Sequence, residues 1–471
     1  MGISSDVPLL REINSQSGDV VTGPVSRRNF LIGAGASAFL ASVPVSAFAA
    51  EPSSAAPPID APPGLPVEWV PAPYQQTGSD PGSYGNFDLA DRPVSPALRF
   101  IVIHDTEETY DRTLQLVQDP TYLAWNYSIR SRDGHVAQHL ETKNVGWHAG
   151  NWWFNSHAVG IEHEGYGAAG NTWFTEEMYA NSARLVAHLA AEYGIPLDRA
   201  HIIGHDQVPG VAPRNIPTQH WDPGPFWDWE HYFQLLGAPL DRGTLGWGRK
   251  PRIGEVVRIL PGFADNLQLV TGCDTNNPPI CLDDSPKPCN FVPLHAAASA
   301  DSELVRDKGK DPSGKPATTN VEDIGARASA GTDYVVAEVQ GDWTAIWYLG
   351  QKAWFFNPHS GPKARVVKDA KVVTAQSAAP VFGVAYPDKS AYADPADYQA
   401  VTPLGYTVSP GEAYVVVDEN PPTDYYKAWT FDANTPNDHI DISQPSAHVL
   451  VNLGHRLAFV RKADVTVSAA G

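Results

Sequence analysis

The stretch LRFIVIHD at residues 98–105 decides the fold, because it begins with one compact run of apolar and β-branched residues. Such a run suits a strand buried at the centre of a sheet. Polar turn residues separate it from further short strands. These strands are predicted at residues 122–129, 134–139, 158–163 and 201–204, with a turn at Arg132–Gly134 between the first two. Because helices alternate with the strands, an α/β domain is expected from about residue 65 to 240.

The longest predicted helix covers residues 175–193. Thr175 is suited to cap its amino end, and two glutamates follow at the positive end of the helix dipole. Gly194 and then Pro196 predict where the helix ends. A second, closing helix is predicted over residues 226–236.

The first 49 residues predict an export signal. Arg27 and Arg28 precede a moderately apolar run that glycines and a proline interrupt, and residues 47–49 have the small-x-small pattern of a cleavage site. The pattern resembles a twin-arginine signal, which carries folded proteins across the membrane. We therefore expect the chain after about residue 50 to be secreted, working outside the cell or in its wall, with no membrane partner.

Proline-rich sequence follows the signal and predicts an extended leader over residues 50–97 rather than packed structure. After residue 250 the sequence pattern changes to short runs typical of β-strands, separated by polar turns. The expected divisions are a signal at 1–49, a Pro-rich linker at 50–65, the α/β domain at 66–240, and β-rich domains at 250–360 and 361–471.

Composition narrows the function. Acidic residues number 53 and basic residues 33, so the formal net charge is −20 and nucleic acid is not an expected partner. Three cysteines are too few for a disulfide scaffold or for a site that needs several thiolates. Cys273, Cys281 and Cys289 fall in one loop, where two could pair outside the cytoplasm; which two is left open.

Eleven of the 16 histidines lie between residues 104 and 231, so the unusual chemistry is expected there. His104 directly follows the first strand, and His205 directly follows the strand at 201–204. Both therefore fall at the carboxyl end of the sheet, where α/β proteins hold their sites. With Asp222, which precedes the closing helix, they form a suitable three-ligand set for zinc.

Glu162 ends another predicted inner strand. A buried carboxylate is costly unless it is paired or has a chemical role, so Glu162 is a candidate proton acceptor. Glu164 is the competing candidate, because strand alternation places both on one face. The residues alone do not separate them.

Six short motifs occur in a familiar order: IVIH at 101–104, DG at 133–134, WHAG at 147–150, GIE at 160–162, GH at 204–205 and DPG at 222–224. This order resembles the zinc-dependent N-acetylmuramoyl-L-alanine amidases related to phage amidases and peptidoglycan recognition proteins. The resemblance covers residues 66–236 and looks closest to the exported actinobacterial type.

The resemblance implies a catalytic domain with a central mixed β-sheet flanked by helices, and a Zn²⁺ held by His104, His205 and Asp222. It implies a catalytic role for Glu162, and oxyanion stabilisation by His220. The substrate would be peptidoglycan, cleaved at the amide between N-acetylmuramic acid and L-alanine. Substrate contacts are expected from Asn126, Tyr127, Trp147 and His148, although relatives usually carry histidine in place of Asn126.

Two other functions stay open. One is a peptidoglycan-binding protein without activity; receptors of that kind typically lose the third ligand, which Asp222 provides here. The other is a zinc amidohydrolase that acts on a different amide or peptide. The β-rich tail resembles bacterial SH3-like modules, which commonly hold such hydrolases on the cell wall.

Overall fold

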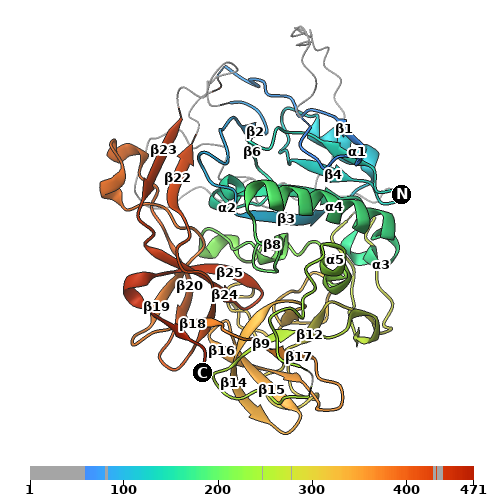
Figure 1. Ribbon diagram of the computed structural model, residues 1–471, viewed down its shortest axis with the longest axis vertical. Helices are drawn as coiled ribbons and strands as arrows, with labels where there is room; N and C mark the ends of the chain where they lie inside the picture. The colour runs from blue at the N-terminus through green and yellow to red at the C-terminus, as the bar shows by residue number, and fades with distance from the viewer. Residues whose placement is uncertain (1–58, 80–82, 247, 277, 428–430, 432–438) are drawn as a thin grey trace, which may run out of the picture.

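The computed structural model describes residues 59–79, 83–246, 248–276, 278–427, 431 and 439–471 (Figure 1). The predicted export signal lies outside these residues. Within the described part of the chain, no helix combines the length and apolar character that a membrane span requires.

A six-stranded mixed sheet forms the centre of the α/β domain, in the order β1-β5-β4-β7-β3-β8. Neighbouring strands run parallel except for the β4–β5 hairpin, which turns where the sequence predicts. The strands are β1 (Val67–Trp69), β3 (Phe100–Asp105), β4 (Tyr127–Ile129), β5 (Val136–Gln138), β7 (Ala158–His163) and β8 (Ile202–Gly204). The expected mixed sheet flanked by helices is confirmed.

Helix α4 (Glu176–Tyr193) covers one face of this sheet and packs against α5 (Trp229–Leu235) (Figure 1). Thr175 caps α4 by accepting from the Met178 N–H at 3.3 Å, and Gly194 ends it with φ = 68°. A left-handed residue at this position favours glycine. The shorter helices are α1 (Tyr110–Val117), α2 (Trp152–His157) and α3 (Gly170–Trp173), and a small ladder joins β2 (Phe87–Asp88) to β6 (Val145–Gly146).

The leader expected over residues 50–97 is wrong for its described part. β1 is an edge strand of the central sheet, and Leu65 and Phe87 are buried in apolar clusters. Asp60 accepts from the Thr142 hydroxyl at 2.9 Å, so the folded domain reaches beyond the expected boundary at residue 66. Proline is compatible with this segment because an edge strand leaves some of its N–H groups unpaired.

Two antiparallel sheets build the β-rich region. The first contains β9 (Val256–Ile259), β14 (Asp333–Gln340), β15 (Trp343–Tyr348), β16 (Gln351–Phe356) and β17 (Ala364–Val366). The second contains β18 (Lys371–Thr374), β19 (Ala379–Phe382), β20 (Pro403–Val408), β21 (Tyr414–Asp418), β24 (His448–Leu453), β25 (Arg456–Arg461) and β26 (Thr466–Ala469). Both sheets contribute to one continuous apolar core. Strand β17 of the first sheet lies beyond residue 360. The expected domain boundaries and the SH3-like assignment stay predictions.

Smaller two-stranded ladders complete the region: β10 (Leu267–Gln268) with β11 (Lys287–Pro288), β12 (Phe291–Pro293) with β13 (Arg327–Ser329), and β22 (Thr423–Lys427) with β23 (Ile440–Gln444). A disulfide joins Cys273 to Cys281, and Cys289 is a buried free thiol. Burial raises the pKa of this thiol to about 12.

The second β-sheet packs directly against the α/β domain. Phe459 of β25 contacts the ring of Trp153 in α2, with centroids 4.8 Å apart, and both join a core with Phe100 and Val102 of β3. Figure 1 shows β24 and β25 next to β8, on the side of the central sheet that faces the β-rich region. The central sheet is thus covered by α4 on one face and by α2 and the β-rich region on the other.

Candidate functional site

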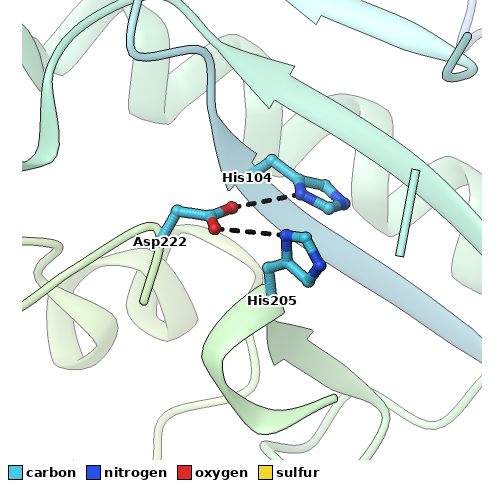
Figure 2. A group of neighbouring side chains, drawn as sticks. All are labelled: His104, His205 and Asp222. Carbon is cyan, nitrogen blue, oxygen red and sulfur yellow. Dashed lines mark hydrogen bonds and ion pairs between the residues drawn. The ribbon is translucent and has the colours of Figure 1, made fainter. Parts of the chain in front are cut away.

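Two imidazoles and one carboxylate meet at the carboxyl end of the central sheet (Figure 2). His104 lies near the end of β3 and His205 directly follows β8, and because Ile103 pairs with Gly204 the two rings leave the sheet side by side. Asp222, from the loop before α5, places Oδ2 3.1 Å from His104 Nδ1 and Oδ1 3.1 Å from His205 Nδ1. All three side chains are buried, with donor atoms within 4.8 Å of one another.

The environment prepares these groups to bind a cation. Burial lowers the pKa of His205 to about 4, so its imidazole is neutral at neutral pH. Burial alone would raise the pKa of Asp222, but His205 and hydrogen bonds from the surrounding imidazoles hold it well below its usual range. Neutral imidazole nitrogens and an ionised carboxylate are ligands that Zn²⁺ prefers. The donor set therefore fits zinc.

Close backbone packing holds Asp222 beside His205. A Cβ at Gly204 would lie 2.8 Å from Cδ of Pro223, so the glycine of the Gly-His motif lets the two loops approach. The backbone N–H of Asp206 donates to the carbonyl of Asp222 at 3.0 Å. The Gly-His motif thus helps to position the Asp222 carboxylate that the Asp-Pro-Gly motif supplies.

The two competing glutamates, Glu162 in β7 and Glu164 just after it, have different surroundings. Glu164 is fully engaged, because its two oxygens accept from the backbone N–H groups of Tyr110 and Ser131, each at 2.8 Å. Glu162 pairs with His104 in the β3–β7 register, and its Oε1 lies 4.0 Å from His104 Nδ1. Its Oε2 is buried with no hydrogen-bond partner among the described residues. Of the two glutamates, Glu162 is therefore the one with a free carboxylate oxygen beside His104.

His220 lies on the open side of the site, with 57% of its side chain exposed. Its ring stacks on that of His205, with centroids 4.1 Å apart and planes 16° from parallel. Its Nδ1 is 3.5 Å from Oδ1 of Asp222. His220 is thus held beside the ligands while it remains accessible from solvent.

His148 occupies the inner side of the site. Its Nδ1 lies 3.0 Å from Nε2 of His104, and the two rings are perpendicular. Only 5% of the residue is exposed, and burial lowers its pKa well below the usual value. A Cβ at Gly160 would come within 2.5 Å of the His148 ring, which explains the glycine of the Gly-Ile-Glu motif.

The other expected substrate contacts differ in exposure. Asn126 and Tyr127 have no exposed surface. The Asn126 amide oxygen accepts from the backbone N–H of Gly160 at 3.1 Å, and the Tyr127 hydroxyl donates to the carbonyl of Asp60 at 2.8 Å. Direct substrate contact by these two side chains conflicts with their burial, so we assign both to holding the sheet together. Trp147 is half-buried, and its role as a substrate contact stays a prediction.

A contact between the β-rich region and the α/β domain, which the sequence did not predict, lies just beyond β3. Glu107, just beyond β3, accepts from the N–H of Gly167 at 2.9 Å and from the side-chain amide of Asn276. Asn276 belongs to the loop that the Cys273–Cys281 disulfide closes. The polar residues of this loop predict turns, but nothing in their spacing indicates that they return to the α/β domain.

Comparisons with known proteins agree on the α/β domain. Residues 93–225 match the family model Amidase_2, described as N-acetylmuramoyl-L-alanine amidase. The chain is 27% identical over 170 residues to N-acetylmuramoyl-L-alanine amidase A of Achromobacter lyticus. This match covers 34% of this chain and 92% of that protein.

Solved structures that match part of the chain include an E90A mutant of PlyL and the E. coli amidase AmiD in complex with anhydro-N-acetylmuramic acid-L-Ala-D-γ-Glu-L-Lys. PlyL is 13% identical with a TM-score of 0.26, and the match covers 37% of this chain and 99% of that one. AmiD is 21% identical with a TM-score of 0.26, over 34% of this chain and 68% of that one.

Proposed function

We propose that this protein is a zinc-dependent N-acetylmuramoyl-L-alanine amidase, which hydrolyses the amide between N-acetylmuramic acid and the L-alanine of the stem peptide. The observation that carries the proposal is the buried group of His104, His205 and Asp222 with the unpartnered carboxylate of Glu162 beside it. The matching family and the name of the Achromobacter lyticus relative support the same reaction.

In this proposal the three ligands hold Zn²⁺, which supplies Lewis acidity: it makes water more acidic and polarises a carbonyl group. Glu162 accepts a proton from the attacking water and returns it to the nitrogen of L-alanine as the C–N bond breaks. Burial, with the nearby charges of Asp222 and Glu107, raises the pKa of Glu162 well above its usual range, which makes it a stronger base.

His220 would stabilise the negative charge that develops on the substrate oxygen. It is exposed and lies beside the ligands, so it can reach a bound substrate without a rearrangement of the fold. A well-placed donor of this kind contributes about 3–4 kcal/mol to the transition state. Trp147 and His148 are the remaining expected substrate contacts.

The decisive experiment is a reaction of residues 50–471 with purified peptidoglycan. Freed α-amino groups and new reducing ends are counted, first as purified, then after chelation, then after zinc is returned. An amidase releases L-alanine amino termini without reducing ends, stops on chelation and resumes with zinc. Bound zinc without amine release would favour a non-catalytic peptidoglycan-binding protein, or a zinc amidohydrolase with another substrate.

We further propose that the chain is exported by the twin-arginine route and works outside the cell or in its wall. The paired arginines at 27–28 motivate this, and the Cys273–Cys281 disulfide fits an oxidising compartment. A fusion of residues 1–49 to a reporter that is active only after folded export would test it. Replacing both arginines with lysine should abolish export, whereas unchanged export would exclude this route.

A further inference from the structure

The two ring nitrogens of His104 face different partners. Nδ1 lies 3.1 Å from the Asp222 carboxylate, on the side where the three ligands converge. Nε2 points the other way, 3.0 Å from Nδ1 of His148. A metal ion at the three-ligand site would therefore meet Nδ1 of His104, and His148 would meet Nε2.

The positions of the ring protons determine which of these nitrogens donates the hydrogen bond and which accepts it. An imidazole that binds a metal through one nitrogen carries its proton on the other. If Nδ1 of His104 binds the metal, Nε2 is a donor, and Nδ1 of His148 must be the acceptor. The hydrogen bond then selects the tautomer of His104 that leaves Nδ1 free for the metal.

The fold holds His148 firmly in this position. The backbone N–H of Trp147 donates to the Ala124 carbonyl at 2.9 Å, and the N–H of Ala149 donates to the Asn155 side chain at 2.7 Å. The His148 ring lies against Gly160, where any side chain would collide with it. The segment that carries the ring is thus fixed on both sides.

We propose that His148 is a positioning residue for the metal site, and not a substrate contact as its sequence motif suggested. It accepts a hydrogen bond from Nε2 of His104 and so orients that ligand and sets its tautomer. The inference rests on the proposed zinc site. Outer groups of this kind typically change metal affinity about 10- to 100-fold when they are replaced.

The direct test is a nitrogen NMR spectrum of the zinc-loaded chain with labelled histidine rings. We expect a scalar coupling across the hydrogen bond between His104 Nε2 and His148 Nδ1, and a ring proton on His104 Nε2 that exchanges slowly with water. Absence of the coupling, together with rapid exchange of that proton, would overturn the inference. This measurement needs neither a substituted chain nor a substrate.

A matched pair of variants gives the second test. In His148→Asn the amide oxygen can take the place of Nδ1, whereas in His148→Gln the longer side chain moves the acceptor away. Competition with a chromophoric chelator should show zinc binding weakened about 10- to 100-fold in the Gln variant and within about threefold of wild type in the Asn variant. Wild-type affinity in both would overturn the inference.

Activity then separates the two proposals. At saturating zinc, a positioning role leaves the KM for a soluble muramyl peptide unchanged, whereas a raised KM with normal zinc affinity would restore the substrate-contact interpretation. A wild-type chain that binds zinc but hydrolyses nothing would refute the proposed amidase and leave the role of His148 to the coupling and affinity data. Should the Gln variant not fold, the wild-type coupling decides.

Discussion

Glu162 and Glu164 provide a matched pair of substitutions, because they lie two residues apart at the end of β7 and differ in what their carboxylates contact. Glu162→Gln removes the proton acceptor beside the ligands. We expect kcat to fall by about 10²- to 10⁴-fold, the usual contribution of general base catalysis. Glu164→Gln leaves the site in place, and we expect activity to be retained.

The expected effects on stability are opposite. The carboxylate of Glu164 accepts two backbone hydrogen bonds, and an amide can accept only one while its N–H₂ group opposes the other donor. Since hydrogen bonds to charged groups each contribute about 1.5–3 kcal/mol, we expect Glu164→Gln to lower the free energy of unfolding by about 2–3 kcal/mol. Glu162 has a buried oxygen without a partner, so a neutral amide there should stabilise the metal-free chain by about 1 kcal/mol.

Two assays on the same preparations check the prediction: denaturant unfolding of the metal-free chains and amine release from peptidoglycan by the zinc-loaded chains. The expected pattern is one inactive, stable variant and one active, less stable variant. A folded but inactive Glu164→Gln chain, or wild-type turnover in Glu162→Gln, would refute these roles of the two carboxylates.

Three further predictions concern the whole chain. Phe459→Ala should lower the free energy of unfolding by about 3–5 kcal/mol, because it opens a cavity against Trp153; a loss under 1 kcal/mol in denaturant titration would argue against the shared core. Reducing the Cys273–Cys281 disulfide should cost about 2.5 kcal/mol by the loop-entropy relation, and a thermal melt that does not shift would contradict this. Burial lowers the pKa of His139 to about 4, below its unfolded value of about 6.5, so its contribution to the free energy of unfolding is present above pH 6.5 and is lost as the pH falls toward 4. A His139→Gln variant should therefore lose stability less steeply between pH 6.5 and 4. An identical slope would refute the assignment.

The sequence predicted the elements whose signals are local. The helix over 175–193 has a capping threonine at one end and a glycine at the other, and the structure places both as expected. Strand β3 (Phe100–Asp105) forms within the run at residues 98–105 and is buried on both faces, and the apolar residues at 100–103 suit that position. His104 and His205 meet because neighbouring parallel strands end at the same edge of the sheet, and the hydrogen bond from the Asp206 N–H to the Asp222 carbonyl brings the loop of Asp222 beside them.

The sequence could not predict what depends on contacts distant along the chain. The proline-rich segment after residue 59 looks like a leader because its composition is that of one, and only its pairing with β5 shows that β1 belongs to the sheet. His148 looks like a substrate contact in its motif, whereas the direction of its ring depends on the packing against Gly160. Strand alternation places Glu162 and Glu164 on the same face, and the two differ in whether backbone N–H groups donate hydrogen bonds to their carboxylates.

The β-rich region packs against the strand that carries the site, as a separately attached module would not. Side chains alternate along β3, so Phe100 and Val102 lie on the same face as His104. That face is covered by the second β-sheet, whose Phe459 belongs to the same apolar cluster as Phe100 and Val102. The strand that carries His104, the first proposed metal ligand, is therefore packed against the β-rich region for most of its length.

Two further contacts join the loops of the site to the same region. Ile216, from the loop between His205 and Asp222, is completely buried in the core that the two β-sheets share. Asn276 reaches Glu107 from the disulfide loop. Because loops beyond both β3 and β8 are held in this way, the position of the ligands depends on the β-rich region. We infer that this region is part of the scaffold of the site, whatever it binds in addition.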